Sequence, residues 1–489
     1  MEQFLTEEVI DANKSALGCV EKEQGISKQN IYDVTRRISN NLRMNFGINN
    51  PYNRMFFTAC ALVAQRYGAR LESLKGRDFS MLNGHIISTI NKYLEDSKHQ
   101  NMHLYILKDA YQKIDIHCTE NQKAINDFID DVCIIYDCVN SDAWHGEDII
   151  SIFFNEFNRY RKKSELGQVF TPEHITSFMY RLINVTQNDY LGDFTCGSGA
   201  FLVNCMYNMM QEAGGYDTDK ANEIRKSHLF GIEFDKEVYA LACANMLIHK
   251  DGEINIEQND MRTSSACEWI KSKPITKVLM NPPYENKYGC MTIVENVLDS
   301  VKAGTDCAFI LPDKKLEKAS KAQIKRILEN HTLTKIIKLP EPLFFGVGVT
   351  TSIFVFKAGQ PQNGQEIFGC YIEDDGLETV KNEGRQDIKH KWKAIEDYWI
   401  DSISKLRDTK YNTAQWINPN EHLSYQMPEK PFEISEEDFK KTAMDYICFK
   451  NGIDTKEFGE KLLNAALYGS EVSSDDTGIN IKIGGGSND

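Results

Sequence analysis

Residues 191–201 read LGDFTCGSGAF: a short apolar run, a glycine-rich turn and the start of an apolar helix (FLVNCMYNMM, residues 201–210). A glycine-rich turn between a strand and a helix lets the backbone approach a ligand closely, at the sheet edge where such folds bind ligands. The spacing differs from GxGxxG and no P-loop lysine follows, so pyrophosphate binding is not indicated. Taken alone, the turn is also compatible with an ordinary strand-to-helix loop.

Further strand-like runs alternate with helix-like stretches up to residue 357. They are HLFGIEF (228–234), KVLMNPP (277–283), CAFILP (307–312), KIIKLP (335–340) and SIFVFK (352–357). Strands that alternate with helices predict βαβ units and a doubly wound, mostly parallel α/β sheet. The last two runs follow each other quickly, so we expect a hairpin at an edge of this sheet.

The regions on both sides of the sheet have helical patterns. Apolar residues recur at helical spacing in residues 53–67 and 121–139, and polar helix-like stretches occupy residues 389–408 and 435–450. We therefore expect an N-terminal helical domain (1–160), an α/β domain (161–375) and a C-terminal helical region (376–470). The remaining residues, 471–489, are rich in Ser, Asp and Gly and predict a flexible tail.

The composition is typical of a soluble intracellular chain, with 41% hydrophobic and 26% charged residues. The net charge of −15, from 56 basic and 71 acidic residues, argues against a surface that coats nucleic acid throughout. It is compatible with a local basic groove, or with a partner that supplies the phosphate contacts. The 13 cysteines include no CxxC pair and no zinc-type spacing, so we expect no metal site. No signal peptide and no apolar run of ~20 residues is visible, so we expect no membrane contact and a cytoplasmic location.

Acidic residues follow two further strand-like runs. Glu233 lies in GIEFD, where a strand-end carboxylate can accept hydrogen bonds from both ribose hydroxyls of a nucleoside cofactor. Its neighbours Ile232 and Phe234 offer apolar cover for a purine. Asp260 follows a third possible strand, where a carboxylate could meet an adenine amino group. Each acid is also compatible with a solvated strand end.

The tetrapeptide Asn281-Pro282-Pro283-Tyr284 lies just beyond another strand that reads as buried. Two prolines fix φ at about −65° and cannot continue a sheet, so the loop is expected to be rigid. It presents two acceptors, the Pro282 carbonyl and the Asn281 side-chain oxygen, beside the flat ring of Tyr284. Hydrogen bonds to both N–H groups of a planar exocyclic amine draw its lone pair out of ring conjugation and make the nitrogen nucleophilic. Alone, NPPY is also compatible with a proline turn.

The order of these motifs resembles that of amino-methylating DNA methyltransferases that use S-adenosylmethionine. More narrowly, the chain is similar to the modification subunit of type I restriction–modification systems. The resemblance spans roughly residues 144–357 and includes GQVFTPEHIT (167–176), CAFILPDKKLEK and IIKLPEPLFFGVGVTTSIFVFK. It implies a Rossmann-like S-adenosylmethionine-dependent methyltransferase core with an N-terminal helical domain and a C-terminal helical extension. One departure is Phe194, because the family often has proline at this position.

The resemblance also assigns roles to single residues. Glu233 would hold the cofactor ribose, and Asp260 would contact the adenine of the cofactor. The whole implied S-adenosylmethionine site comprises Phe170, Thr171, Pro172, Asp193, Thr195, Gly197, Ser198, Gly199, Glu233, Asp260 and Asn281. The implied transfer site comprises Asn281, Pro282, Pro283 and Tyr284. Tyr284, with Phe344 or Phe345, would pack against the target base.

The implied reaction is methyl transfer to adenine N6 in duplex DNA, because an asparagine at the start of this motif is typical of adenine methylation. The target base would be flipped out of the duplex, and its amino nitrogen would attack the sulfonium methyl in line. No convincing target-recognition domain or nuclease motif is visible in the chain. We therefore expect double-stranded DNA and a separate specificity subunit as partners, with a second modification subunit and a restriction subunit as possible further members.

Two basic stretches are candidates for phosphate contacts, although solvated helix faces give the same pattern. They comprise Arg159, Arg161, Lys162 and Lys163, and then Lys314, Lys315, Lys318, Lys321, Lys325 and Arg326. Other functions stay open: a stand-alone adenine methyltransferase, an enzyme that methylates a protein glutamine or a ribosomal RNA guanine, or a non-catalytic scaffold subunit. Intact cofactor and NPPY motifs count against the scaffold.

Overall fold

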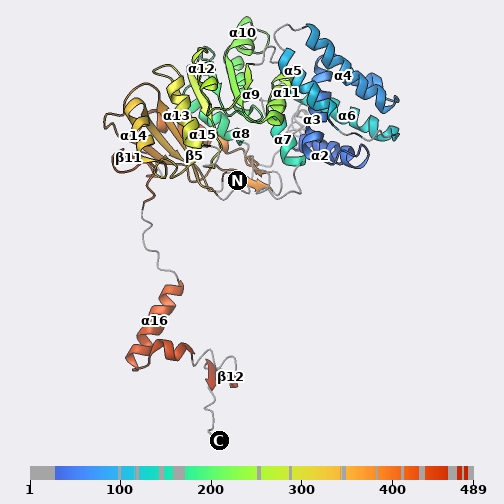
Figure 1. Ribbon diagram of the computed structural model, residues 1–489. Coiled ribbons are helices and arrows are strands. Elements are labelled where there is room, and N and C mark those ends of the chain that lie inside the picture. Colours follow the sequence, from blue (N-terminus) through green and yellow to red (C-terminus); the bar gives the residue numbers. More distant parts are fainter. Residues whose placement is uncertain are drawn as a thin grey trace, which may run out of the picture. The chain divides into compact units, whose positions relative to one another are not determined.

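The structure is a computed structural model that describes most of the chain (Figure 1). The described residues are 28–482 without 97–100, 115, 117–119, 142–147, 158–170, 250–254, 286–288, 342, 344–348, 381–383, 409–411, 429–435, 461–470 and 476–477. The chain divides into two compact units, Met1–Tyr425 and Gln426–Asp489, and each is described by itself.

Helices make up the N-terminal part of the first unit. They are α2 (Lys28–Met44), α3 (Pro51–Arg66), the 3-10 turn Leu71–Leu74, α4 (Phe79–Asp96), α5 (Asn101–Gln112), α6 (Gln122–Val139) and α7 (Ile149–Phe157). The two helices predicted at residues 53–67 and 121–139 are confirmed. Helix α3 is central, because ten successive residues from Met55 to Ala64 are buried. It starts at Asn50, whose side chain accepts a hydrogen bond from the Tyr52 N–H, and Pro51 occupies the first turn.

A nine-stranded sheet forms the rest of this unit. Its strands are β1 (Leu191–Asp193), β2 (Leu229–Glu233), β3 (Ile256–Gln258), β4 (Lys277–Met280), β5 (Asp306–Pro312), β6 (Thr332–Lys338), β7 (Thr351–Lys357), β8 (Ile367–Tyr371) and β11 (Gln415–Ile417). The order is β11-β8-β6-β7-β5-β4-β1-β2-β3, and β3, β2, β1, β4 and β5 are all parallel. The predicted mostly parallel α/β sheet is confirmed.

The expected hairpin at the sheet edge is only partly correct. Strands β6 and β7 do pair in antiparallel fashion, but β7 lies between β6 and β5, and β8 and β11 continue the sheet beyond β6. Six of the seven residues of β7 are buried. Such an unbroken apolar strand is typical of the middle of a sheet, where both faces are covered.

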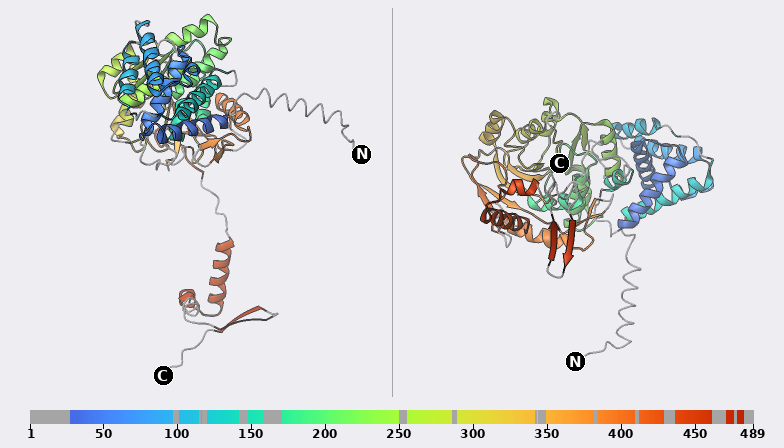
Figure 2. Two further views of the ribbon diagram at one scale, coloured as in Figure 1. Left: turned by 90° about the vertical axis from the view of Figure 1, so that its right-hand side faces the viewer. Right: turned by 90° about the horizontal axis from the view of Figure 1, so that it is seen from below.

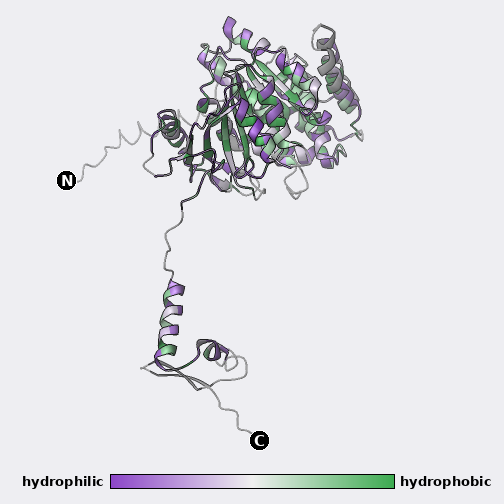
Figure 3. Ribbon diagram, turned by 60° about the vertical axis from the view of Figure 1, so that its left-hand side comes forward, coloured by the Kyte–Doolittle hydropathy of each residue, from purple (hydrophilic) through white to green (hydrophobic). Residues whose placement is uncertain are grey.

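Helices cover both faces of the sheet. One face carries α8 (Glu173–Leu182), α9 (Ala200–Glu212), α10 (Asp219–Ser227), α11 (Lys236–Ile248) and α15 (Trp392–Ser404), and the other carries α12 (Ser264–Lys271), α13 (Cys290–Ser300) and α14 (Lys321–Asn330). Along β4, Leu279 joins the first core, whereas Val278 and Met280 join the second, as the alternation of strand side chains requires. Figure 3 shows apolar strands between helices whose outer sides are polar.

The N-terminal helices join the sheet through α11. Helices α3 and α5 both pack against it, and α11 is buried along almost its whole length. Figures 1 and 2 show these blue to cyan helices beside the green helices that cover the sheet. None of the described helices combines the length and the apolar character needed to cross a membrane.

The C-terminal part differs from the helical region expected there. The predicted helices are present as α15 and α16 (Glu436–Lys450), but β9 (Glu378–Val380) and β10 (Gly384–Gln386) form a small antiparallel pair and β11 joins the main sheet. Strands of three residues are too short to give a recognisable alternation in the sequence. The limits of the predicted domains stay predictions.

Part of the range predicted as a flexible tail, residues 471–489, forms β-structure, and the tail itself stays a prediction. Strands β12 (Glu471–Asp475) and β13 (Gly478–Lys482) pair as an antiparallel hairpin in the second unit. Valine and isoleucine at positions 472, 479 and 481 favour strands. The Ser, Asp and Gly content favours disorder and outweighed this strand preference in the sequence-based prediction. The last residues, 483–489, lie outside the described part.

Candidate functional site

The candidate residues gather where three neighbouring parallel strands end. Asp193 ends β1, Glu233 ends β2, and Asn281 directly follows β4. Because β2, β1 and β4 are adjacent and parallel, their carboxyl ends lie at one edge of the sheet. This is the edge at which open α/β sheets bind ligands.

The glycine-rich turn depends on the backbone freedom of two glycines. Gly197 has φ 56° and Gly199 has φ 87°, and Gly199 is the residue before α9. A Cβ atom at Gly197 would have no atom within 4 Å, so the space beside this turn is open. The requirement for glycine at position 197 is therefore conformational, and the backbone is accessible to a ligand.

Packing explains the departure at Phe194. The Phe194 side chain is buried, and a Cβ atom added to Gly192 would lie 2.3 Å from its ring. The ring thus occupies the space that the missing side chain of Gly192 leaves. The phenylalanine thus packs in the second core, against the end of β1.

Glu233 links the turn after β1 to the turn after β2. Its Oε2 accepts a hydrogen bond from the Gly197 N–H at 2.9 Å, and its Oε1 accepts one from the Asp235 N–H at 2.9 Å. Burial raises the pKa of the Glu233 carboxyl, while these backbone hydrogen bonds oppose the rise. A carboxylate can accept about four hydrogen bonds, so Glu233 can still accept one from a ligand.

Asp193 is a buried carboxylate with few partners. Its side chain is 2% exposed, and Oδ1 accepts a hydrogen bond from the Thr195 N–H at 3.3 Å. Burial raises the pKa of Asp193 well above its usual range, and nearby Glu233 raises it further. No described cationic side chain pairs with either acid, and the buried Thr195 hydroxyl has no hydrogen-bond partner among the described residues. The turn therefore presents uncompensated polar groups.

Asp148, at the start of α7, is a residue of this region that the sequence analysis missed. Its Oδ2 accepts a hydrogen bond from the Ser198 hydroxyl at 2.6 Å, and its Oδ1 accepts one from Asn245 Nδ2 at 2.7 Å. Asn245 Nδ2 also donates to the Ser198 carbonyl at 2.9 Å. The hydroxyl of Ser198, predicted to contact the cofactor, is thus engaged inside the protein. An aspartate before the apolar run IISIFF is a helix-cap signal. It indicates the start of a helix but not a contact with Ser198.

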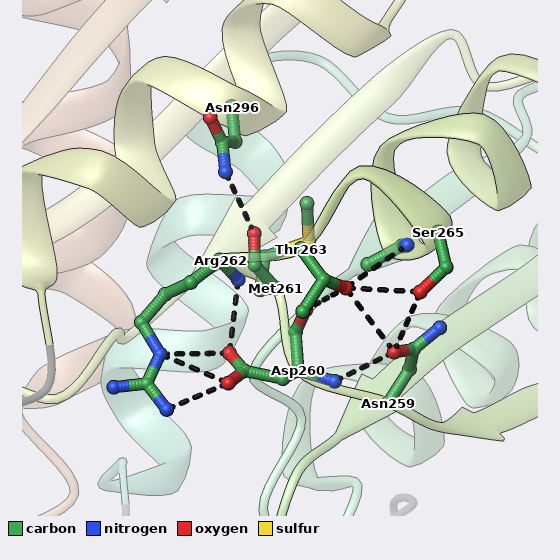
Figure 4. A network of polar contacts seen from close by, with 8 residues as sticks. Asn259, Asp260, Met261, Arg262, Thr263, Ser265 and Asn296 are labelled. Atoms are coloured by element: carbon green, nitrogen blue, oxygen red, sulfur yellow. Dashed lines mark hydrogen bonds and ion pairs between the residues drawn. The ribbon is translucent and has the colours of Figure 1, made fainter.

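Asp260 lies in a turn after β3 that is held by local hydrogen bonds (Figure 4). Arg262 forms a two-pronged ion pair with it: Nε lies 2.8 Å from Oδ1 and Nη2 lies 2.6 Å from Oδ2. This pairing lowers the pKa of Asp260, so the carboxylate stays ionised. The Arg262 guanidinium carbon also lies 5.6 Å from the centre of the Phe234 ring, which is 61% exposed. Asp260 and Phe234 thus lie close together at the end of the sheet.

Hydrogen bonds fix the Asn281–Tyr284 loop on both sides. Asn281 Nδ2 donates to Thr171 Oγ1 at 3.1 Å, and the Tyr284 hydroxyl donates to Asn281 Oδ1 at 2.8 Å. Lys315 Nζ donates to the Tyr284 carbonyl at 2.5 Å. Burial raises the pKa of Tyr284 well above its usual range, so its hydroxyl remains a donor. Asn281 Oδ1 therefore points in a fixed direction and keeps one free lone pair.

The structure brings together most of the predicted site residues. Thr171 contacts Asn281, and Pro172 directly precedes α8. Three predicted residues, Phe170, Phe344 and Phe345, lie outside the described residues. So does the first basic stretch, Arg159, Arg161, Lys162 and Lys163.

A family model described as N-6 DNA methylase matches residues 147–311 and 290–451, which together make up more than half of the chain. The chain belongs to this family. A type II restriction enzyme and methyltransferase of Heyndrickxia coagulans is 31% identical to this chain over 329 residues, covering 62% of this chain and 50% of the relative. A type I restriction enzyme methylase subunit of Escherichia coli is 24% identical over 276 residues, covering 51% and 54%. This chain thus spans about half the length of these relatives.

Solved structures share the fold of this member of the N-6 DNA methylase family. The type I restriction–modification methyltransferase subunit from Streptococcus thermophilus has a TM-score of 0.52 at 14% identity, covering 80% of this chain and 96% of that one. A chain of another type I restriction–modification system has a TM-score of 0.57 at 16% identity, covering 90% and 99%. The predicted methyltransferase core with an N-terminal helical region is confirmed.

Proposed function

We propose that this chain transfers a methyl group from S-adenosylmethionine to adenine N6 in duplex DNA, as the modification subunit of a type I restriction–modification complex. The arrangement around Asn281 carries the proposal. Its amide is held between Thr171 and Tyr284, in a proline loop at the same sheet edge as Asp193 and Glu233. The N-6 DNA methylase family supports the same class of reaction.

The residues at the glycine-rich turn fit S-adenosylmethionine. This cofactor is cationic at its amino group and sulfonium, and Asp193 and Glu233 are buried carboxyl groups without a described cationic partner, whose ionised forms a bound cation would stabilise. The Thr195 hydroxyl has no hydrogen-bond partner in the described part of the chain and would hydrogen-bond to the methionine part. The remaining lone pairs of Glu233 suit the ribose hydroxyls, and Asp260 with Phe234 suits the adenine. When bound, the cofactor supplies an electrophilic methyl group.

The loop residues then orient the amino group of the target base. Asn281 Oδ1 and the Pro282 carbonyl would accept its two N–H groups, and the ring of Tyr284 would stack on the base. Flipping the base costs a few kcal/mol, of which stacking returns about 1–3 kcal/mol. The Tyr284 hydroxyl positions Asn281 Oδ1 for this contact. Alignment of the nitrogen with the methyl group is the main contribution of the protein, and no strong general base is needed.

The C-terminal helical region is the proposed docking surface for a specificity subunit. Helix α16 exposes several large apolar side chains: Phe439 (69%), Met444 (45%), Tyr446 (64%), Ile447 (56%) and Phe449 (82%). Exposed apolar side chains at this density are typical of interaction surfaces. A second modification subunit and a restriction subunit would complete the assembly, and the specificity subunit would select the DNA sequence.

One experiment tests this function. The chain is purified alone and after co-expression with the products of neighbouring genes, and transfer of tritiated methyl to unmethylated genomic DNA is measured. Mass spectrometry of the digested DNA then identifies the modified base. We expect N6-methyladenine, formed only when a second protein is present. Methylation of another base, or of no base, contradicts the proposal.

A stand-alone adenine methyltransferase is the second candidate. The relative from Heyndrickxia coagulans, which is 31% identical, is named a type II restriction enzyme and methyltransferase. Robust DNA methylation by the isolated chain would favour this second function. It would also place sequence recognition within the chain itself.

A further inference from the structure

A separate pocket lies beside the Asn281–Tyr284 loop. Its volume is about 570 Å³, and Tyr284, Lys314, Lys315, Lys318, Ser320 and Gln323 are among the residues that line it. None of the residues at the glycine-rich turn contributes to its walls, nor does Glu233 or Asp260. The pocket is therefore distinct from the candidate cofactor site, although both adjoin the same loop.

The charge of this pocket is mainly positive. Three lysines line it, and Glu285 is its only acidic lining residue among those that the structure describes. Lys314 and Lys318 are exposed, and no ion pair within the described part of the chain engages either of them. Lys315 Nζ bonds to the Tyr284 carbonyl and so joins the basic turn to the loop.

The acidic residues of the same turn are engaged elsewhere. Glu317 Oε1 accepts hydrogen bonds from the Leu423 N–H at 3.1 Å and from the Ser424 hydroxyl at 2.8 Å. Asp313 pairs with Lys338 and accepts a hydrogen bond from the Ser352 hydroxyl. These contacts tie both carboxylates to neighbouring segments and leave the lysines to determine the charge of the pocket.

The start of α14 adds to this positive character. Ser320 is the residue before the helix and lines the pocket, and its hydroxyl makes no capping hydrogen bond. No acidic residue occupies the first turn of α14. The N-terminus of a helix carries partial positive charge and unpaired N–H groups, which favour an anion.

We propose that this pocket binds a backbone phosphate of DNA next to the flipped adenine, an inference that rests on the proposed function. Tyr284 lines the pocket. When the flipped base stacks on the Tyr284 ring, the phosphodiester group of the same nucleotide lies within one nucleotide of that ring and so close to the pocket. Lys314 and Lys318 neutralise the phosphate, and Lys315 couples this contact to the position of Tyr284. A protein glutamine substrate has no such phosphate, so the pocket favours a nucleic acid.

Salt-dependent DNA binding tests the pocket. The Lys314→Gln/Lys318→Gln double variant of the full chain, in the form that methylates DNA, is compared with the unchanged protein by fluorescence anisotropy on a duplex over a series of salt concentrations. The slope of log K against log salt is negative. Loss of one phosphate contact should make it less steep by about 0.9, regardless of DNA sequence. The Lys314→Arg/Lys318→Arg variant keeps both charges and should restore the slope.

The matched control is Lys325→Gln. Lys325 lies on α14, pairs with Glu329 at 3.7 Å and does not line the pocket, so its removal should leave the slope unchanged. Equal slopes for the double variant and the unchanged protein would overturn the proposal, as would failure of the arginine variant to restore the slope. In either case the proposed function stands if the unchanged protein still methylates DNA. An unchanged protein that neither binds nor methylates DNA would overturn both.

Discussion

The Ser198 hydroxyl lies 2.6 Å from Asp148 Oδ2, so the glycine-rich turn after β1 is hydrogen-bonded to Asp148, the residue directly before α7. Asn245 of α11 contacts both partners and completes the link. The burial of Asp148 raises the pKa of its carboxyl, and the hydrogen bonds oppose that rise. The N-terminal helices thus help to determine the shape of the glycine-rich turn.

Ser198→Ala should weaken cofactor binding through this link. It removes a hydrogen bond to a buried carboxylate, which should lower the free energy of unfolding by about 1.5–3 kcal/mol. Because the turn loses one of its constraints, the Kd for S-adenosylmethionine should rise as well. Urea unfolding and isothermal titration calorimetry measure the two effects.

Ser177→Ala is the control for this variant. The Ser177 hydroxyl donates to the buried carboxylate of Glu396 at 2.8 Å, between α8 and α15. Its loss should lower stability to a similar extent and leave the cofactor Kd unchanged. If both variants weakened cofactor binding equally, the effect would be one of general stability, and the positioning role of Asp148 and Ser198 would be wrong.

Asn281→Ala should abolish methyl transfer and leave cofactor binding largely intact. The change removes an acceptor for the amino group of the base but none of the carboxylates at the glycine-rich turn. Tyr284→Phe should keep the stacking but lose the hydrogen bond that positions Asn281. That hydrogen bond is worth about 1 kcal/mol, so kcat should fall roughly fivefold to tenfold. Single-turnover assays give the rates and calorimetry gives the cofactor Kd. Loss of cofactor binding in Asn281→Ala would contradict this division of roles.

Glu233→Gln should raise the Kd for S-adenosylmethionine. Its two oxygens accept the Gly197 and Asp235 N–H groups, and an amide would place an NH2 group against one of these donors. That mismatch is present with or without ligand and mainly lowers stability, whereas the Kd rises because the amide loses one charged hydrogen bond to a ribose hydroxyl. Such a bond contributes about 1.5–3 kcal/mol, which corresponds to roughly tenfold to hundredfold in Kd. Glu237→Gln, a change of the same kind on the neighbouring helix α11, should have little effect. Equal affinity of the Glu233→Gln and unchanged proteins would remove Glu233 from the cofactor site.

Stabilisation by S-adenosylmethionine should increase with pH. The raised pKa values of Asp193 and Glu233 mean that the folded, ligand-free protein binds protons more tightly than the unfolded chain. Its stability therefore falls as the pH rises from the ordinary pKa of these groups, about 4, through their raised values. A cationic ligand favours the ionised carboxylates, so its binding should strengthen over the same interval.

Thermal unfolding with and without saturating cofactor checks this expectation between about pH 5 and about pH 8. The difference in Tm should grow toward higher pH, and Asp193→Asn should remove much of the trend. A difference in Tm that is independent of pH would show that neither carboxylate titrates against the ligand.

The sequence predicted those site residues that directly follow or end a strand, because the order of strands along the chain then implies where the residues lie. Asp193, Glu233 and Asn281 each end a strand-like run, and parallel strands bring such ends to one edge. Asp148 could not be placed in the same way, because its contact with Ser198 depends on the packing of distant helices. For β7, the sequence predicted a hairpin at an edge of the sheet, whereas β7 lies between β5 and β6, because strand order is a long-range property that the local pattern leaves undetermined.

The insertion of β7 between β5 and β6 has a consequence for how the chain emerges from the ribosome. Until residues 351–357 are synthesised, β5 lacks the neighbour that pairs with all seven of its residues, and β6 lacks the neighbour that pairs with six of its seven. Open, apolar strand edges recruit strands from other molecules. A premature stop before residue 351 should therefore yield aggregating fragments in place of a smaller, folded methyltransferase, and nascent chains should need protection until that strand has entered the sheet.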